Sequence, residues 1–142
     1  MDTPVEIDWL SMAIKILAVL LLVALNGFFV AAEFALVKVR GTQLHPLVDE
    51  GQRRAKVAHY ILKNLDAFLS ACQLGITLAS LALGWIGEPI FETLLQPIFH
   101  WIAIESETAK STISFGFGFS VITILHIVVG EIAPKSLAIQ KP

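Results

Sequence analysis

An almost unbroken apolar run from Trp9 to Val37 constrains the fold of this chain more than any other feature. A helix that crosses the hydrocarbon core of a bilayer needs about 20 consecutive apolar residues, and this run exceeds that length. Two further apolar stretches, residues 67–86 and 111–129, follow along the chain. The pattern predicts an all-α membrane protein with three transmembrane helices.

The composition also indicates a membrane protein rather than a soluble domain, and it argues against nucleic-acid binding. The chain has 142 residues, of which 56% are hydrophobic and 15% charged, against about 25% charged residues in soluble domains. We expect one domain covering residues 1–142, with the lipid bilayer as its surroundings. Without a strongly basic face we expect no nucleic-acid partner. Because the sequence lacks a nucleophile–base pattern and a phosphate loop, we also expect no enzymatic activity and no organic cofactor.

The distribution of basic residues predicts the orientation. Residues 38–66 form the only extended polar stretch, and we expect two short cytoplasmic helices in it, the second an amphipathic helix from Arg53 to Leu65. If this loop and the C-terminus face the cytoplasm, all ten Lys and Arg residues except Lys15 and Lys110 lie inside. The N-terminus is then outside, and the chain ends in a cytoplasmic juxtamembrane segment.

Residues 90–102, with the sequence IFETLLQPIFHWI, are apolar but too short to cross a bilayer. Pro97 interrupts them. We expect a separate interfacial or re-entrant helix on the outer side of the membrane.

Glu131 is the most informative polar residue, because it lies at the end of the third apolar stretch. A charged side chain within the bilayer costs at least about 2.5 kcal/mol on insertion scales and usually marks an ion path or a polar partner. Pro134 follows three residues later; it lacks a backbone N–H and disfavours a helical Ala133, which frees carbonyl groups around Gly130. Free carbonyls beside a carboxylate predict a site that accepts a cation.

Three other residues within the apolar stretches carry oxygen atoms that suit such a site: Asn26, Gln73 and Thr77. Mg²⁺ prefers carboxylate, carbonyl, amide and hydroxyl oxygens, so these residues could complete its coordination if the three helices meet. Glu33 shares a helix face with Asn26, although it could instead be a membrane-edge acid paired with Lys38 or an arginine. A purely structural membrane anchor remains an equal alternative at this stage.

His126 is five residues before Glu131, about half a turn around an α-helix from it. We therefore do not expect the two side chains to pair. A hydrogen-bonded packing role is the expectation for His126.

Three segments carry a resemblance to a known family: NGFFVAAEFAL from Asn26 to Leu36, GITLAS from Gly75 to Ser80, and GEIAPKSLA from Gly130 to Ala138. In order and spacing they closely resemble the transmembrane (DUF21) domain of the CorC/cyclin M (CNNM) family, in its hemolysin-like bacterial branch. The resemblance covers nearly the whole chain. It implies a homodimer in the bacterial inner membrane, with three spans per subunit followed by cytoplasmic CBS domains. We therefore expect this chain to be the membrane domain of a longer protein.

The resemblance also implies a function, namely Mg²⁺ efflux by exchange with Na⁺, with Mg²⁺ and possibly Na⁺ as the transported ions. Glu131 matches the ion-binding glutamate of the family, and Thr77 lies where members often have asparagine. The carbonyls of the segment from Pro134 to Ala138 match a kinked backbone that helps to bind the ion. Val30 and Ala32 depart from the pattern, since members often have serines there. The alternative is a non-transporting anchor or regulatory module for the CBS domains.

Overall fold

The computed structural model describes residues 8–142, apart from the side chain of Glu88, and these residues form helices and connecting turns without a strand. The elements are α1 (Trp9–Lys38), α2 (Gly41–Asp49), α3 (Arg53–Lys63), α4 (Leu65–Trp101), α5 (Glu107–Leu125), the π-helical segment η1 (His126–Ile132) and α6 (Ala133–Gln140). Three of the helical stretches are long and apolar enough to cross a membrane: Trp9–Lys38, Leu65–Trp101 and Glu107–Gln140. The predicted all-α fold with three candidate spans is confirmed.

The first span begins and ends where its sequence provides suitable groups. Asp8 caps α1, since its carboxylate accepts hydrogen bonds from the backbone N–H groups of Leu10 at 3.1 Å and Ser11 at 3.3 Å. Lys38 occupies the last turn, where a positive charge interacts favourably with the helix dipole. With 30 residues, α1 is about 45 Å long at 1.5 Å per residue. It is long enough to cross the hydrocarbon core with a tilt.

The separate interfacial helix expected over residues 90–102 is not observed, because residues up to Trp101 continue α4 without a break. Pro89 and Pro97 both lie inside this helix. A proline within a helix costs about 3 kcal/mol, but tertiary packing offsets that cost here. Ile90 and Phe99 are buried, and the ring of Phe91 lies against Gly118 and Phe117 of α5. This packing outweighs the tendency of Pro97 to end the helix.

The third span is also longer than expected. Residues 111–129 were predicted to cross the membrane, whereas α5, η1 and α6 form one continuous helical element from Glu107 to Gln140. Ser106 caps its start by accepting a hydrogen bond from the N–H of Ala109 at 3.3 Å. The backbone changes to the wider π-helical form at His126 and returns to an α-helix at Ala133.

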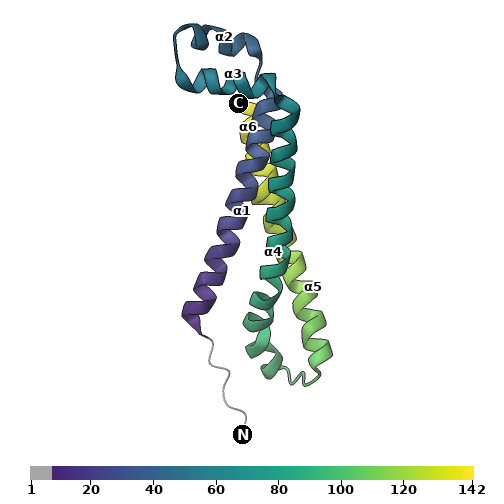
Figure 1. Cartoon of the computed structure of the whole chain (residues 1–142). Helices are drawn as coiled ribbons and strands as arrows, with labels where there is room; N and C mark the ends of the chain where they lie inside the picture. Colours follow the sequence, from purple (N-terminus) through teal and green to yellow (C-terminus); the bar gives the residue numbers. More distant parts are fainter. Residues whose placement is uncertain (1–7) are drawn as a thin grey trace.

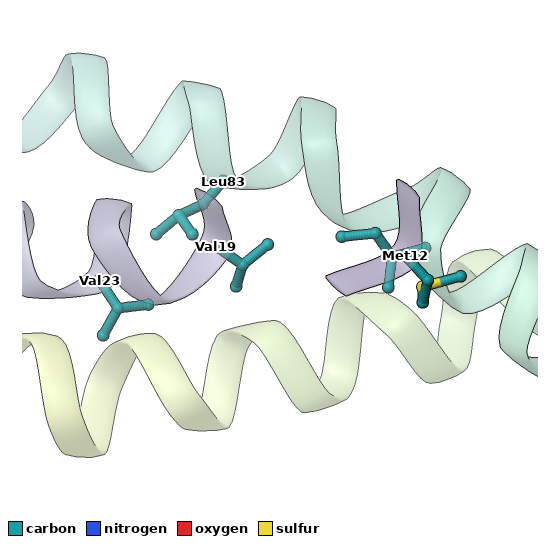
Figure 2. Packing of buried hydrophobic residues seen from close by; sticks show 5 residues of the cluster. Met12, Val19, Val23 and Leu83 are labelled. Carbon is teal, nitrogen blue, oxygen red and sulfur yellow. The ribbon is translucent and has the colours of Figure 1, made fainter. Parts of the chain in front are cut away.

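The three long elements pack most closely at one end. In Figure 1, α1, α4 and the element α5–η1–α6 lie side by side near the C-terminus and separate toward the other end. A small apolar cluster forms between them from Met12, Val19, Val23, Leu83 and Ile90. Figure 2 shows Val19, Val23 and Leu83 directed into the space between the helices. Most other large apolar side chains are exposed on the outside, as lipid-facing side chains are.

Helices α2 and α3 form a hairpin that crosses the end of the bundle, on the same side as the C-terminus (Figure 1). Gly51 makes the turn between them with a φ of 82°, a conformation that glycine adopts without strain. The two short helices predicted in the polar loop are therefore confirmed, the second ending at Lys63. Residues 1–7, expected outside the cell, lie outside the described residues.

Candidate functional site

Asn26 is the polar centre of the bundle. It lies in the middle of α1, and its side chain is fully buried, with 0% exposure. The Nδ2 atom donates a hydrogen bond to the backbone oxygen of Gly130 at 3.0 Å and lies 3.0 Å from Nε2 of His126. Polar side chains between membrane helices hydrogen-bond across the interface in this way. Asn26 thus joins the first span to the third.

The bond to Gly130 has a specific cause. In an α-helix the oxygen of Gly130 would accept from the N–H of residue 134, and that residue is Pro134, which has no N–H. A carbonyl left without a partner in an apolar interior costs about 1–3 kcal/mol. The amide of Asn26 supplies the missing donor. Pro134 thus offers no N–H to the Gly130 oxygen, and α1 supplies a donor to it.

The π-helical segment corrects the prediction that His126 and Glu131 do not pair. Nε2 of His126 lies 3.2 Å from Oε1 of Glu131. In an α-helix, residues five apart point in different directions, but a π-helix closes i→i+5 hydrogen bonds and brings such residues onto one face. The prediction was wrong because it assumed the α-helical period. Pro134, which lacks a backbone N–H, was the sign of this change in the sequence.

Ser80 of α4 completes the cluster. Its Oγ lies 3.5 Å from Nε2 of His126 and donates a hydrogen bond to the backbone oxygen of Ile76 at 2.8 Å. All three long elements thus contribute a side chain: Asn26, Ser80, and the pair His126 and Glu131. We refer to these four residues as the polar cluster. Sequence reasoning did not assign a site role to Ser80 or His126.

An open cavity leads to the polar cluster. It has a volume of about 240 Å³ and is lined mainly by apolar side chains of α4, α5 and η1. The polar side chains at its wall are those of Ser80, Thr123, His126 and Glu131. The side chain of Glu131 is 46% exposed and that of His126 is 14% exposed. Glu131 therefore lies at the cavity wall, and Nε2 of His126 is within reach of both Glu131 and the buried Asn26.

The other residues predicted for a cation site lie elsewhere in the bundle. Gln73 pairs with Glu33, its Nε2 lying 3.5 Å from the Oε1 of that residue. The hydroxyl of Thr77 donates to the backbone oxygen of Gln73 at 2.9 Å, and the side chain is exposed. Within residues 8–142, the hydrogen bonds do not link Gln73 or Thr77 to the polar cluster. Glu33 contacts Gln73 rather than Lys38 or an arginine.

The proline break packs closely on the first span. The ring of Pro134 approaches Gly27 so that a Cβ at position 27 would lie 3.1 Å from Cγ of the proline. Ala138, one turn further, is buried as well. Val30, on the neighbouring turn of α1, is a buried apolar residue and offers no oxygen. On α1, the amide of Asn26 is thus the polar group that reaches the proline break.

Two features of the cluster bear on its chemistry. Oδ1 of Asn26 is buried and lacks a hydrogen-bond partner among the described residues. In the same part of the chain, three or more His, Cys, Asp and Glu side chains do not gather into a group that could hold a metal ion. A cation here would therefore depend on amide, hydroxyl or backbone oxygens in addition to His126 and Glu131.

Comparison with known proteins assigns the chain to a family. The sequence profile of the cyclin M transmembrane N-terminal domain (CNNM) matches residues 16–142. The UPF0053 protein YugS of Bacillus subtilis is 47% identical over 128 residues, which are 90% of this chain and 30% of that protein. YhdT of the same organism is 49% identical over 120 residues, 84% of this chain and 26% of that protein. An uncharacterized Mycobacterium tuberculosis protein, Rv1841c, is 34% identical over 127 residues, 89% of this chain and 35% of that protein. The chain spans about a third or less of each relative, and it belongs to the cyclin M transmembrane domain family.

Proposed function

We propose that this chain is the membrane domain of a divalent-cation transporter, and that its cargo is Mg²⁺, moved outward in exchange for Na⁺. One observation carries the proposal: the carboxylate of Glu131 lies beside a cavity, at the turn where Pro134 frees the Gly130 carbonyl and Asn26 reaches across from α1. A carboxylate, a carbonyl and an amide at one place within an apolar bundle are the ligand types that hard cations take. Membership of the cyclin M family supports the same reading.

We also propose in which membrane the domain lies, how it assembles and how it is oriented. We place it in the bacterial inner membrane as a homodimer, with the N-terminus outside and the α2–α3 hairpin and C-terminus in the cytoplasm. The hairpin and the C-terminus lie at one end of the bundle, which agrees with the basic residues in both (Figure 1). The relatives are roughly three times as long as this chain, which leaves room for cytoplasmic CBS domains after it.

A second candidate function is a non-transporting membrane anchor or regulatory module. It is favoured by Val30, which is buried and apolar where members of the family often have serine. It is also favoured by the positions of Gln73 and Thr77, which bond to other groups than the polar cluster. Under this alternative the cluster would serve only to hold the helices together.

Ion flux from vesicles separates the two candidates. The purified chain is reconstituted into liposomes loaded with Mg²⁺, and release is followed with a fluorescent indicator, with and without an inward Na⁺ gradient. We expect Na⁺-dependent release, reduced about tenfold or more by Glu131→Gln, because loss of groups at a metal site commonly costs that much. Glu105→Gln, an exposed carboxylate in the α4–α5 turn, is the matched control and should leave the flux unchanged. If wild type and both variants release Mg²⁺ only at the background rate, the transport function is rejected and the membrane-anchor function remains.

A further inference from the structure

Helix α3 combines positive charge with exposed apolar surface. Four of its 11 residues are basic and none is acidic. The basic residues are Arg53, Arg54, Lys56 and Lys63. The ion pairs formed within residues 8–142 do not include any of these four side chains. On the same helix the side chains of Val57 and Tyr60 are 58% and 62% exposed. Basic residues alternating with exposed apolar ones are typical of a helix that lies in a membrane interface.

The two kinds of side chain share one side of the helix. Arg53, Lys56, Val57 and Tyr60 follow one another at intervals of three, one and three residues, which places all four within one broad stripe of an α-helix. All four residues are exposed. We refer to them as the exposed face of α3.

Helix α2 covers the other side of α3. Ala55, which is about 200° around the helix from Val57, is buried, and so is Leu44 of α2. The ring centres of His45 on α2 and His59 on α3 lie 5.3 Å apart. The exposed face therefore points away from α2.

The position of the hairpin decides what the exposed face meets. In Figure 1, α3 lies on the bundle side of α2, and both helices extend sideways beyond α1. A face of α3 that points away from α2 is thus turned toward the region beside the spans, where lipid surrounds the bundle. The ring of Tyr60 agrees with this direction, since its centre lies 6.3 Å from that of Phe68, near the start of α4.

We propose that the exposed face of α3 lies in the headgroup layer of the bilayer and binds the phosphate groups of anionic lipids. Tyrosine is enriched at this level of a membrane, and Val57 adds apolar surface for the acyl boundary. Arg53 and Lys56 supply the charge, because a guanidinium binds phosphate through two parallel hydrogen bonds and an ammonium attracts it as a point charge. The inference goes beyond the proposed function and requires only that the bundle spans a bilayer, with or without ion transport.

Competition between two lipids tests the proposal on the whole chain. The purified protein in mild detergent is mixed with equal amounts of phosphatidylglycerol and phosphatidylcholine, and native mass spectrometry counts which lipid it retains. Each basic residue near a surface increases association with anionic lipid about fivefold. We therefore expect a preference of about tenfold or more for phosphatidylglycerol, and Arg53→Gln combined with Lys56→Gln should lower it by a similar factor.

A matched control removes the same charge elsewhere. Lys15 and Lys110 lie toward the opposite end of the bundle, and Lys15→Gln combined with Lys110→Gln should leave the preference unchanged. Equal retention of the two lipids by the wild type would overturn the inference. So would a preference that survives the double substitution on α3, or one that both double variants lose to the same extent.

A second measurement tests the direction of the exposed face. Spin labels are attached to Val57→Cys, or to Thr42→Cys on the side of α2 away from α3, in a Cys72→Ala background reconstituted into liposomes that contain phosphatidylglycerol. We expect the label at position 57 to collide mainly with oxygen, which concentrates in the bilayer, and the label at position 42 mainly with a water-soluble nickel chelate. Equal exposure of both labels to the chelate would contradict the proposal and leave the exposed face for an acidic protein surface.

Discussion

The bond between Asn26 and Gly130 makes a quantitative prediction that links two distant positions. Asn26→Ala removes the side-chain donor to the Gly130 carbonyl, which cannot accept from the residue four positions later because that residue is Pro134. An unsatisfied buried carbonyl costs about 1–3 kcal/mol, while interhelical hydrogen bonds in membranes average about 0.6 kcal/mol. Adding the lost contact to His126 and the vacated volume, we expect Asn26→Ala to lower the free energy of unfolding by about 2–3 kcal/mol.

Pro134→Ala should remove part of this cost. An alanine at this position restores a backbone N–H four residues after Gly130, so the carbonyl can return to the helical pattern. In that background Asn26→Ala should cost only about 1 kcal/mol, which gives a coupling energy of about 1–2 kcal/mol between the two positions. Such coupling is large for side chains on different helices.

The assay is reversible unfolding of the four proteins of this double-mutant cycle in mixed micelles, driven by sodium dodecyl sulfate and followed by tryptophan fluorescence. Asn64→Ala is the control, because this exposed asparagine donates to a backbone oxygen of its own segment at 2.9 Å. It should change stability by less than about 0.5 kcal/mol. Additive effects of Asn26→Ala and Pro134→Ala would refute the argument that the asparagine replaces the missing helical donor.

Two further predictions concern packing. Gly75→Ala should destabilise the bundle by about 1–3 kcal/mol, because a Cβ there would lie 2.6 Å from the ring of Phe29. Gly84→Ala is the control and should be neutral or stabilising, because a Cβ at that position meets nothing within 4 Å. Equal thermal stability of the two variants would argue against close contact of α1 and α4. Lys135→Met should lower the free energy of unfolding by about 0.5–1 kcal/mol in the same assay, because the ammonium lies 4.7 Å from the centre of the Phe34 ring. Lys141→Met, at the exposed end of the chain, is the control. Equal stability of the two variants would show that the contact between Lys135 and Phe34 does not stabilise the bundle.

The apolar runs were sufficient to predict the spans, because the length of an apolar segment is a local property that the bilayer itself selects. The polar loop with its two helices followed from the same kind of local pattern. Asn26, Glu131 and the carbonyl freed by Pro134 could also be predicted, since each is unusual within an apolar stretch. These features require no knowledge of how the helices pack.

The remaining features depend on contacts between segments that are distant in the sequence. Residues 90–101 continue α4 because Phe91 packs on Gly118, a pairing that neither segment reveals alone. The pairing of His126 with Glu131 depends on a change of helical period, and that change occurs where Asn26 takes over the carbonyl of Gly130. A fixed period of 3.6 residues per turn therefore placed the histidine on the wrong side of the helix.

The π-helical segment also fixes the rotation of everything that follows it. Each residue advances an α-helix by about 100°, so a π-helical turn, which holds roughly one residue more than an α-helical one, rotates α6 by that angle relative to a uniform α-helix. The rotation directs Pro134 toward Gly27 and buries Ala138. Any change that returned η1 to the α-helical form would turn α6 about its own axis. The width of one helical turn thus decides which face the C-terminal helix presents to the first span.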